Sequence, residues 1–143
     1  MRAPYTQLYL HAVWATWDRL PLITPEIQPK VFAAIQAQSQ KAAVDILTIG
    51  GVSDHVHVLL RFPTTTTIAD VVKYLKGGST HLITQVMRLP DPFKWQGGYG
   101  AFTISKTAVP RVRDYILRQE EHHRHNRTLP DLETTATPDS PRS

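Results

Sequence analysis

The sequence predicts a single α+β domain, built on a four-stranded antiparallel sheet. Its 143 residues and 16.2 kDa suit one hydrophobic core. Hydrophobic residues make up 41% and charged residues 20%, close to globular averages and far from a disordered chain. Segments with strand-like patterns alternate with segments of helical periodicity, in the order β-α-β-β-α-β-α. No repeat interrupts this order.

The first half of the chain accounts for three strands and one helix. Residues 8–16 are rich in β-formers and predict a strand. The helix begins near the Thr24-Pro25-Glu26 start signal, and its apolar residues recur at three- and four-residue steps: Ile27, Val31, Ala34 and Ile35. Residues 44–49 predict a second strand. The GGVSD turn then leads into a third strand at 55–62, so these two strands are expected to pair antiparallel.

The second predicted helix begins near Thr67, with one apolar face: Ile68, Val71, Val72 and Leu75. Two adjacent glycines, Gly77 and Gly78, predict a kink or break, after which the helix resumes over 79–87.

The last elements are a strand and a helix. Residues 95–105 (WQGGYGAFTIS) predict a glycine-rich turn into the fourth strand, and Pro110 suits the first turn of a helix that runs to about Arg127. The complete order is that of the split βαβ, ferredoxin-like fold, with helices on one face of the sheet and one C-terminal helix appended. We therefore predict one domain over residues 1–127.

Composition narrows the functional classes. The absence of cysteine excludes disulfides, thiolate metal sites and a cysteine nucleophile. No apolar run approaches a membrane span and the N-terminus lacks the apolar core of a signal peptide, so we expect a soluble cytoplasmic protein without a membrane partner. Residues 128–143 are rich in proline and threonine and predict a flexible tail. Residues 1–127 carry 15 basic and 9 acidic groups, a balance that suits a polyanionic partner.

Two histidines stand out on the third predicted strand. His55 and His57 flank Val56, and because side chains alternate across a strand, both imidazoles face the same way. Such a pair could supply two nitrogen ligands to a metal, or it could simply be solvated on an exposed sheet face.

The final predicted helix places Tyr115 and Gln119 at positions i and i+4, on one face. Tyr115 could be a tyrosine at the edge of the core, with its ring buried and its hydroxyl in water. It could also attack phosphorus to form a covalent intermediate, while a metal held by the two histidines and Gln119 polarises the phosphate.

Other residues are candidates for contacts with nucleic acid. Basic side chains would bind phosphates and aromatic rings would stack on unpaired bases, although ordinary surface charge and core packing explain such residues as well. The set comprises Lys73, Lys76, Trp95, Tyr99, Arg111, Arg113 and Arg118. His122, His123 and His125 are interpreted as a solvated helix end. The segment LKGGST lacks the phosphate-loop pattern.

Several segments together resemble a known family. They are HAVWAT followed by Arg19, DHVHVLL at 54–60, VVKYLKGGST at 71–80, WQGGYGAFTIS at 95–105 and VRDYILRQEEHHR at 112–124. The chain resembles the small single-tyrosine (Y1) transposases of bacterial and archaeal insertion sequences, the IS200-like members of the HUH (histidine, hydrophobe, histidine) endonucleases. The resemblance covers most of the chain, and the proline-rich tail lies outside it.

The resemblance implies a mechanism and partners. Tyr115 would be the nucleophile, and His55, His57 and Gln119 would hold a divalent metal, Mg²⁺ or Mn²⁺. The enzyme would cleave and rejoin single-stranded DNA hairpins at element ends through a 5′-phosphotyrosine, as a homodimer whose tyrosine helix acts in cis or in trans. The alternatives are a related HUH nicking enzyme, such as a replication initiator or relaxase, and a catalytically silent module that binds nucleic acid.

Overall fold

The computed structural model describes residues 4–89, 92–119, 133 and 135. Four strands form one antiparallel sheet in the order β2-β3-β1-β4. They are β1 (Tyr9–Ala15), β2 (Asp45–Val52), β3 (His55–Arg61) and β4 (Gly100–Ile104). The predicted α+β, split βαβ fold is confirmed.

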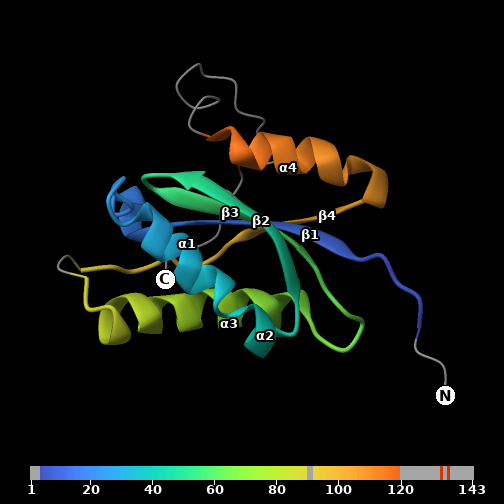
Figure 1. The fold of residues 1–143 in the computed structure, drawn as a ribbon, viewed down its shortest axis with the longest axis horizontal. Coiled ribbons are helices and arrows are strands. Elements are labelled where there is room, and N and C mark those ends of the chain that lie inside the picture. Colours follow the sequence, from blue (N-terminus) through green and yellow to red (C-terminus); the bar gives the residue numbers. More distant parts are fainter. Residues whose placement is uncertain (1–3, 90–91, 120–132, 134, 136–143) are drawn as a thin grey trace.

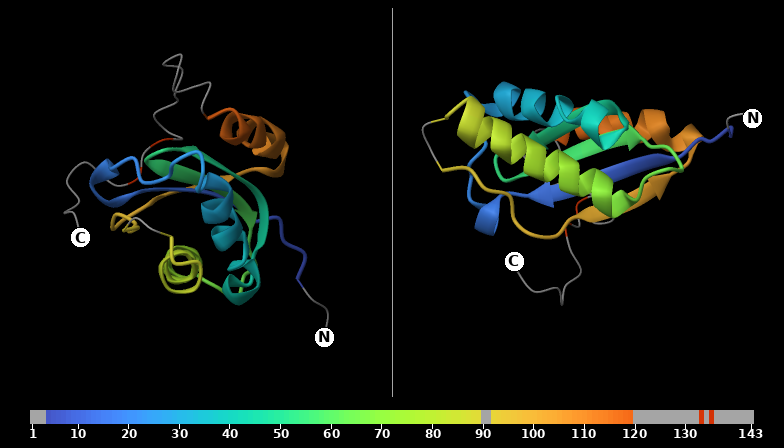
Figure 2. Two further views of the ribbon diagram at one scale, coloured as in Figure 1. Left: turned by 60° about the vertical axis from the view of Figure 1, so that its left-hand side comes forward. Right: turned by 90° about the horizontal axis from the view of Figure 1, so that it is seen from below.

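Helices cover both faces of the sheet (Figure 1). The helices α1 (Gln28–Gln36), α2 (Ser39–Ala42) and α3 (Ile68–His81) lie on one side, and α4 (Val109–Leu117) lies on the other. Figure 2 shows the same separation of α4 from α3 in a second view. Short helical turns cover Trp17–Arg19, Leu82–Val86 and Lys106–Ala108. The structure therefore places the appended helix on the sheet face opposite α1 to α3.

The alternation of side chains divides each strand between two apolar clusters. Even-numbered residues of β1 and β3, such as Trp14 and Val56, join the main core beneath α1 and α3. Odd-numbered Leu59 packs with Val112 and Ile116 of α4 in a smaller cluster. The helix α4 is thus held by few apolar side chains, and the odd positions of β1 and β3 also carry the polar residues beneath it.

The predicted break at Gly77 and Gly78 is wrong. Thr67 caps α3 by accepting a hydrogen bond from the Asp70 amide, and the helix continues through both glycines to His81. A Cβ on Gly78 would overlap the Gln38 side chain, so a glycine here permits close packing rather than a kink. The chain then enters the π-helical turn Leu82–Val86.

The end of the predicted final helix lies outside the described residues, as do His122, His123 and His125. Most of the predicted flexible tail lies there as well. Within the described part of the chain, no helix combines the length and apolarity needed to cross a membrane.

A glycine determines how closely α4 approaches the sheet. A Cβ on Gly50 of β2 would overlap the Ile116 carbonyl oxygen, well inside van der Waals contact. A Cβ on Gly77, in contrast, would meet no described atom within 4 Å outside its own helix and chain neighbours. A glycine-to-alanine substitution can therefore be compared at a tightly packed position, Gly50, and at an open position, Gly77.

We predict that Gly50→Ala lowers the free energy of unfolding by about 1–3 kcal/mol, because α4 must move to admit the methyl group. Gly77→Ala should leave it unchanged or raise it by up to about 1 kcal/mol, because alanine favours the helix. Denaturant unfolding followed by circular dichroism measures both. Equal effects of the two variants would contradict the packing described here.

Candidate active site

Both predicted histidines lie beneath α4. His55 and His57 are on odd positions of β3, opposite Ala15 and Val13 of β1. The predicted common orientation is confirmed, because Val56 joins the main core on the other face. Their exposed fractions are only 2% and 0%, so the pair is not a solvated surface feature. Buried imidazoles need polar partners, and each ring nitrogen of this pair has one.

Tyr115 projects from α4 towards this pair. Its ring is buried, and its centroid lies 6.1 Å from that of His57 in an edge-to-face arrangement. The Tyr115 hydroxyl donates a hydrogen bond of 2.5 Å to Oε2 of Glu133. The nucleophile candidate and the histidines of the same chain therefore share one site.

Glu133 connects the three side chains. Its Oε1 lies 3.0 Å from Nε2 of His55 and 3.2 Å from Nε2 of His57, while Oε2 accepts the Tyr115 hydroxyl. Burial raises the pKa of Glu133, but hydrogen bonds from His55 and His57 outweigh burial and hold that pKa well below its usual range. The carboxylate is therefore ionised at neutral pH. Its Oε1 faces the two imidazoles, and its Oε2 faces the Tyr115 hydroxyl.

Glu133 was absent from the sequence-based candidates. It lies in the segment predicted as a flexible tail, 14 positions beyond Gln119, and no motif of the sequence marks it. A single acidic residue in a proline- and threonine-rich segment gives no periodicity from which a site can be inferred.

His55 is held by carboxylates at both ring nitrogens. Nδ1 lies 2.7 Å from Oδ1 of Asp54, whose Oδ2 lies 3.7 Å from the Arg19 guanidinium. Burial lowers the pKa of His55, but the hydrogen bonds to Asp54 and Glu133 and their charges outweigh it and raise that pKa. Asp54 is thus a second partner that fixes the orientation of the ring.

His57 contacts a second buried histidine, His11, on the neighbouring strand. Nε2 of His11, on β1, lies 2.8 Å from Nδ1 of His57, and the rings stack with centroids 5.0 Å apart. Burial and the neighbouring His57 lower the pKa of His11 to about 3, so His11 is neutral. A neutral His11 can donate to Nδ1 of His57 or accept from it, so it can support either tautomer of His57.

The donor atoms suit a divalent cation. Nε2 of His55, Nε2 of His57 and a carboxylate oxygen of Glu133 all lie within 4.8 Å of one another. Oε1 of Glu133 lies 3.0 and 3.2 Å from the two imidazole nitrogens, so a cation bound here would replace these hydrogen bonds with bonds to the same three residues. Imidazole nitrogen and carboxylate oxygen are both ligands for Mn²⁺, and each Nδ1 has a partner that orients its ring.

Gln119 is buried one helical turn beyond Tyr115, and its Nε2 donates 3.1 Å to the Tyr115 carbonyl. This bond ties the Gln119 side chain to the backbone of the tyrosine. Its assignment as a metal ligand stays a prediction.

The remaining candidates separate into two groups. Arg111 and Arg113 are exposed on α4, on the same side of the sheet as the site, and the exposed Arg118 directly follows this helix. Lys73 is exposed on α3, across the sheet. Lys76, Trp95 and Tyr99 instead make contacts within the protein. Lys76 donates to the carbonyls of Gln96 and Gly98, at 2.7 and 3.0 Å, and burial lowers its pKa.

The expectation that Trp95 stacks on a base does not fit its placement. Trp95 is 6% exposed, packs edge-on against Trp14 and Phe93, and donates to the Ser79 hydroxyl. Tyr99 packs against the same core. The Trp95 ring is thus part of the core, and the Tyr99 ring is partly buried against it.

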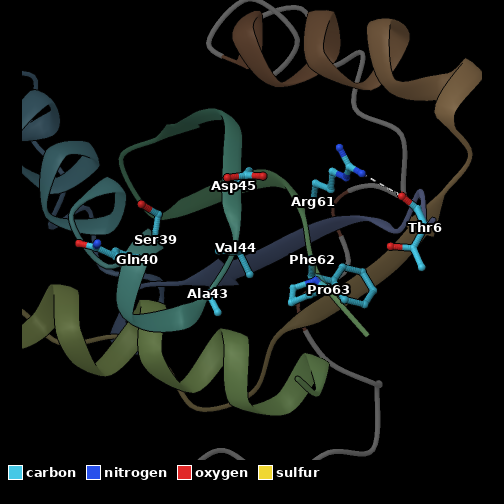
Figure 3. Close-up of a pocket in the computed structure, with 9 residues that line it drawn as sticks. All are labelled: Thr6, Ser39, Gln40, Ala43, Val44, Asp45, Arg61, Phe62 and Pro63. Carbon is cyan, nitrogen blue, oxygen red and sulfur yellow. Dashed lines mark hydrogen bonds between the residues drawn. The ribbon is translucent and has the colours of Figure 1, made fainter. Parts of the chain in front are cut away.

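A separate pocket lies at the opposite end of β3 from His55 (Figure 3). Its lining includes Asp45, Arg61 and Phe62, and Arg61 donates to the Thr6 carbonyl across it. The histidines and Tyr115 are not part of this lining, so the pocket is distinct from the candidate site.

The fold and the site together define a ferredoxin-like domain with a paired-histidine centre facing a tyrosine helix. Residues 4–119 match the family model described as IS200-like transposase, so the chain belongs to this family. It is therefore a transposase, an enzyme that cleaves DNA. Glu133 lies beyond the matched region.

Known relatives agree with this family. The ISDra2 transposase TnpA of Deinococcus radiodurans is 24% identical over 120 residues, which cover 80% of this chain and 86% of the relative. A solved transposase structure from the same species has a TM-score of 0.66 at 24% identity, covering 81% of this chain and 93% of its own. A REP-associated tyrosine transposase bound to a REP hairpin has a TM-score of 0.58 at 18% identity, covering 90% and 74%.

Proposed function

We propose that this transposase cleaves and rejoins single-stranded DNA hairpins through a covalent 5′-phosphotyrosine at Tyr115. The observation that carries the proposal is the single carboxylate, Glu133, that bonds the Tyr115 hydroxyl and both imidazoles. A hairpin substrate is supported by the solved relative, which is bound to a REP hairpin. The exposed arginines of α4 offer phosphate contacts beside the site.

The residues of this chain account for the covalent step. Oη of Tyr115 forms a bond to the phosphorus, and the bond between phosphorus and the 3′ oxygen breaks. Oε2 of Glu133 accepts the hydrogen bond of the tyrosyl hydroxyl and orients it, and the proton passes on to water, because a carboxylate with so low a pKa does not retain it. The electron pair of the broken bond stays on the 3′ oxygen, which takes a proton from water. Attack by a 3′-hydroxyl on the phosphotyrosine reverses the step, so strands can be rejoined without an external energy source.

His55, His57 and Glu133 would hold a divalent cation, Mg²⁺ or Mn²⁺, together with Gln119. When bound, the cation stabilises the negative charge that develops on the phosphoryl oxygens. His11 and Asp54 would keep the two imidazoles oriented towards it.

A tyrosine that acts in cis is supported by the position of Tyr115 against the histidines of its own chain. A homodimer, which the family resemblance implies, would then bring together two sites that are each complete. A related nicking enzyme would use the same chemistry. A silent binding module is disfavoured by the presence of nucleophile, ligands and proton acceptor in one cluster.

Tyr115→Phe should abolish the covalent protein–DNA adduct while leaving the fold and DNA binding intact, because only the nucleophilic oxygen is lost. Incubation with single-stranded DNA that carries the element's own ends, followed by a denaturing gel, detects the adduct. Tyr99→Phe is the matched control and should retain it. An adduct in the Tyr115→Phe variant would place the nucleophile elsewhere.

Glu133→Gln should slow adduct formation by about 10²–10⁴-fold, because the hydroxyl of the nucleophile loses its carboxylate acceptor. Rapid-quench sampling of the same gel assay gives the rate. Glu26→Gln makes the same change at an exposed position and should leave the rate unchanged. A faster reaction in Glu133→Gln would instead show that the carboxylate blocks the site.

Mixing Tyr115→Phe chains with His55→Ala/His57→Ala chains distinguishes the two arrangements of the tyrosine helix. If the tyrosine acts in cis, every site carries one defect and no adduct should form. Recovery of adduct to about half of the wild-type amount per dimer would require a tyrosine that acts in trans.

A further inference from the structure

The turn that follows β1 forms an apolar pocket beside the candidate site. Trp17, Leu20, Leu22, Pro92 and Lys94 contribute to its lining, together with Pro21 and Thr24, and its volume is about 490 Å³. The rings of Trp14 and Trp95 are buried, whereas Trp17 is 36% exposed and Leu20 is 45% exposed. Trp17 and Leu20 therefore contribute accessible apolar surface to the lining of this pocket.

The pocket is rigidly connected to the strand that carries the histidines. The Thr16 amide donates 2.9 Å to the Asp54 carbonyl, and the Ile23 amide donates 2.9 Å to the Ser53 carbonyl. From the other wall, the Trp17 amide donates 2.9 Å to the Lys94 carbonyl. Both walls are therefore fixed relative to the turn that immediately precedes His55.

The backbone of this turn is strained. Asp18 and Arg19 both have φ of 51°, in the left-handed region that non-glycine residues seldom adopt. The conformation is stabilised by the Asp18 amide, which donates 2.8 Å to Oε1 of Gln96. Strain of this kind is retained where surrounding structure over-determines the backbone, often at binding sites.

One cation, Lys94, lines the pocket, and a second, Arg19, lies between two lining residues in the chain. Nζ of Lys94 lies 4.0 Å from the centroid of the Trp17 ring, a cation–π contact that covers one face of the indole. The Arg19 guanidinium lies 3.7 Å from the Asp54 carboxylate, which in turn bonds His55. An apolar, aromatic pocket lined by one cation and followed in the chain by another is complementary to a nucleotide, whose base is apolar on its faces and whose phosphate is anionic.

We propose that this pocket binds an unpaired nucleobase of the DNA strand next to the cleaved phosphate. The base packs against Trp17 and the leucine and proline side chains, and Arg19 and Lys94 contact the flanking phosphates. The link from Arg19 through Asp54 to His55 places this subsite adjacent to the reaction centre. The inference rests on the proposed single-stranded substrate and adds a base-binding position to it.

A matched pair of variants tests the subsite. Trp17→Ala removes the exposed indole. Tyr74→Ala is the control, because Tyr74 is 38% exposed and has Lys41 5.8 Å from its ring, but it lies on α3, across the sheet from the site. Fluorescein-labelled oligothymidylate and an abasic oligonucleotide of equal length serve as probes, since they carry the same phosphates with and without bases.

We expect Trp17→Ala to weaken oligothymidylate binding roughly tenfold and to leave binding of the abasic probe unchanged, in fluorescence polarisation at fixed salt. Tyr74→Ala should change neither. Trp17→Phe, which keeps an aromatic ring, should have an intermediate effect. This variant also tests the subsite if the alanine variant misfolds. Oligothymidylate should quench the tryptophan fluorescence of the wild-type protein, and Trp17→Ala should abolish this quenching.

Equal losses for both probes, or equal losses in Trp17→Ala and Tyr74→Ala, would overturn the subsite while leaving the proposed function intact. A wild-type protein that binds neither probe would contradict the single-stranded substrate itself, and the subsite with it.

Discussion

The close approach of α4 to the sheet is the constraint on which the candidate site depends. Gly50 has no side chain where Ile116 passes over β2, so the helix lies near enough for Tyr115 to reach the face that carries His57. Few apolar side chains hold α4, namely Val112, Ile116 and their neighbours over Leu59. Packing of a small cluster, not of the main core, therefore sets how closely Tyr115 approaches the histidines.

The polar groups beneath α4 form one connected cluster. Glu133 bonds three side chains, His11 supports His57 from β1, and Asp54 supports His55 from the preceding turn. Such a cluster is costly to bury unless every member has partners, which is the case for the two metal-ligand candidates on β3. The arrangement also explains why this sheet face is polar at one end and apolar at the other: the histidines lie near the start of β3 and Leu59 further along it.

The order of the strands and main helices along the chain could be predicted from the sequence. The two-residue period of strands and the 3.6-residue period of helices are local patterns, which a sequence records directly. The sequence also identified His55 and His57 as a pair, since their common face follows from strand geometry alone. It failed at Gly78, where the reason for glycine is a contact with distant Gln38. It also gave no sign of the burial of Trp95, which depends on contacts with Ser79 and Trp14. Glu133 and His11 were missed for the same physical reason. Their roles arise from contacts 76 and 46 positions away in the chain, which no local pattern records.

The position of Lys76 has a consequence for the glycine-rich segment that precedes β4. Its ammonium group donates to the carbonyls of Gln96 and Gly98, at 2.7 and 3.0 Å, and so ties this segment to α3. Loss of the ammonium group would leave two carbonyl oxygens without that donor, which costs free energy where the carbonyls are partly shielded from water. A basic residue of α3 thus serves here as a brace for the backbone that leads into the last strand of the sheet.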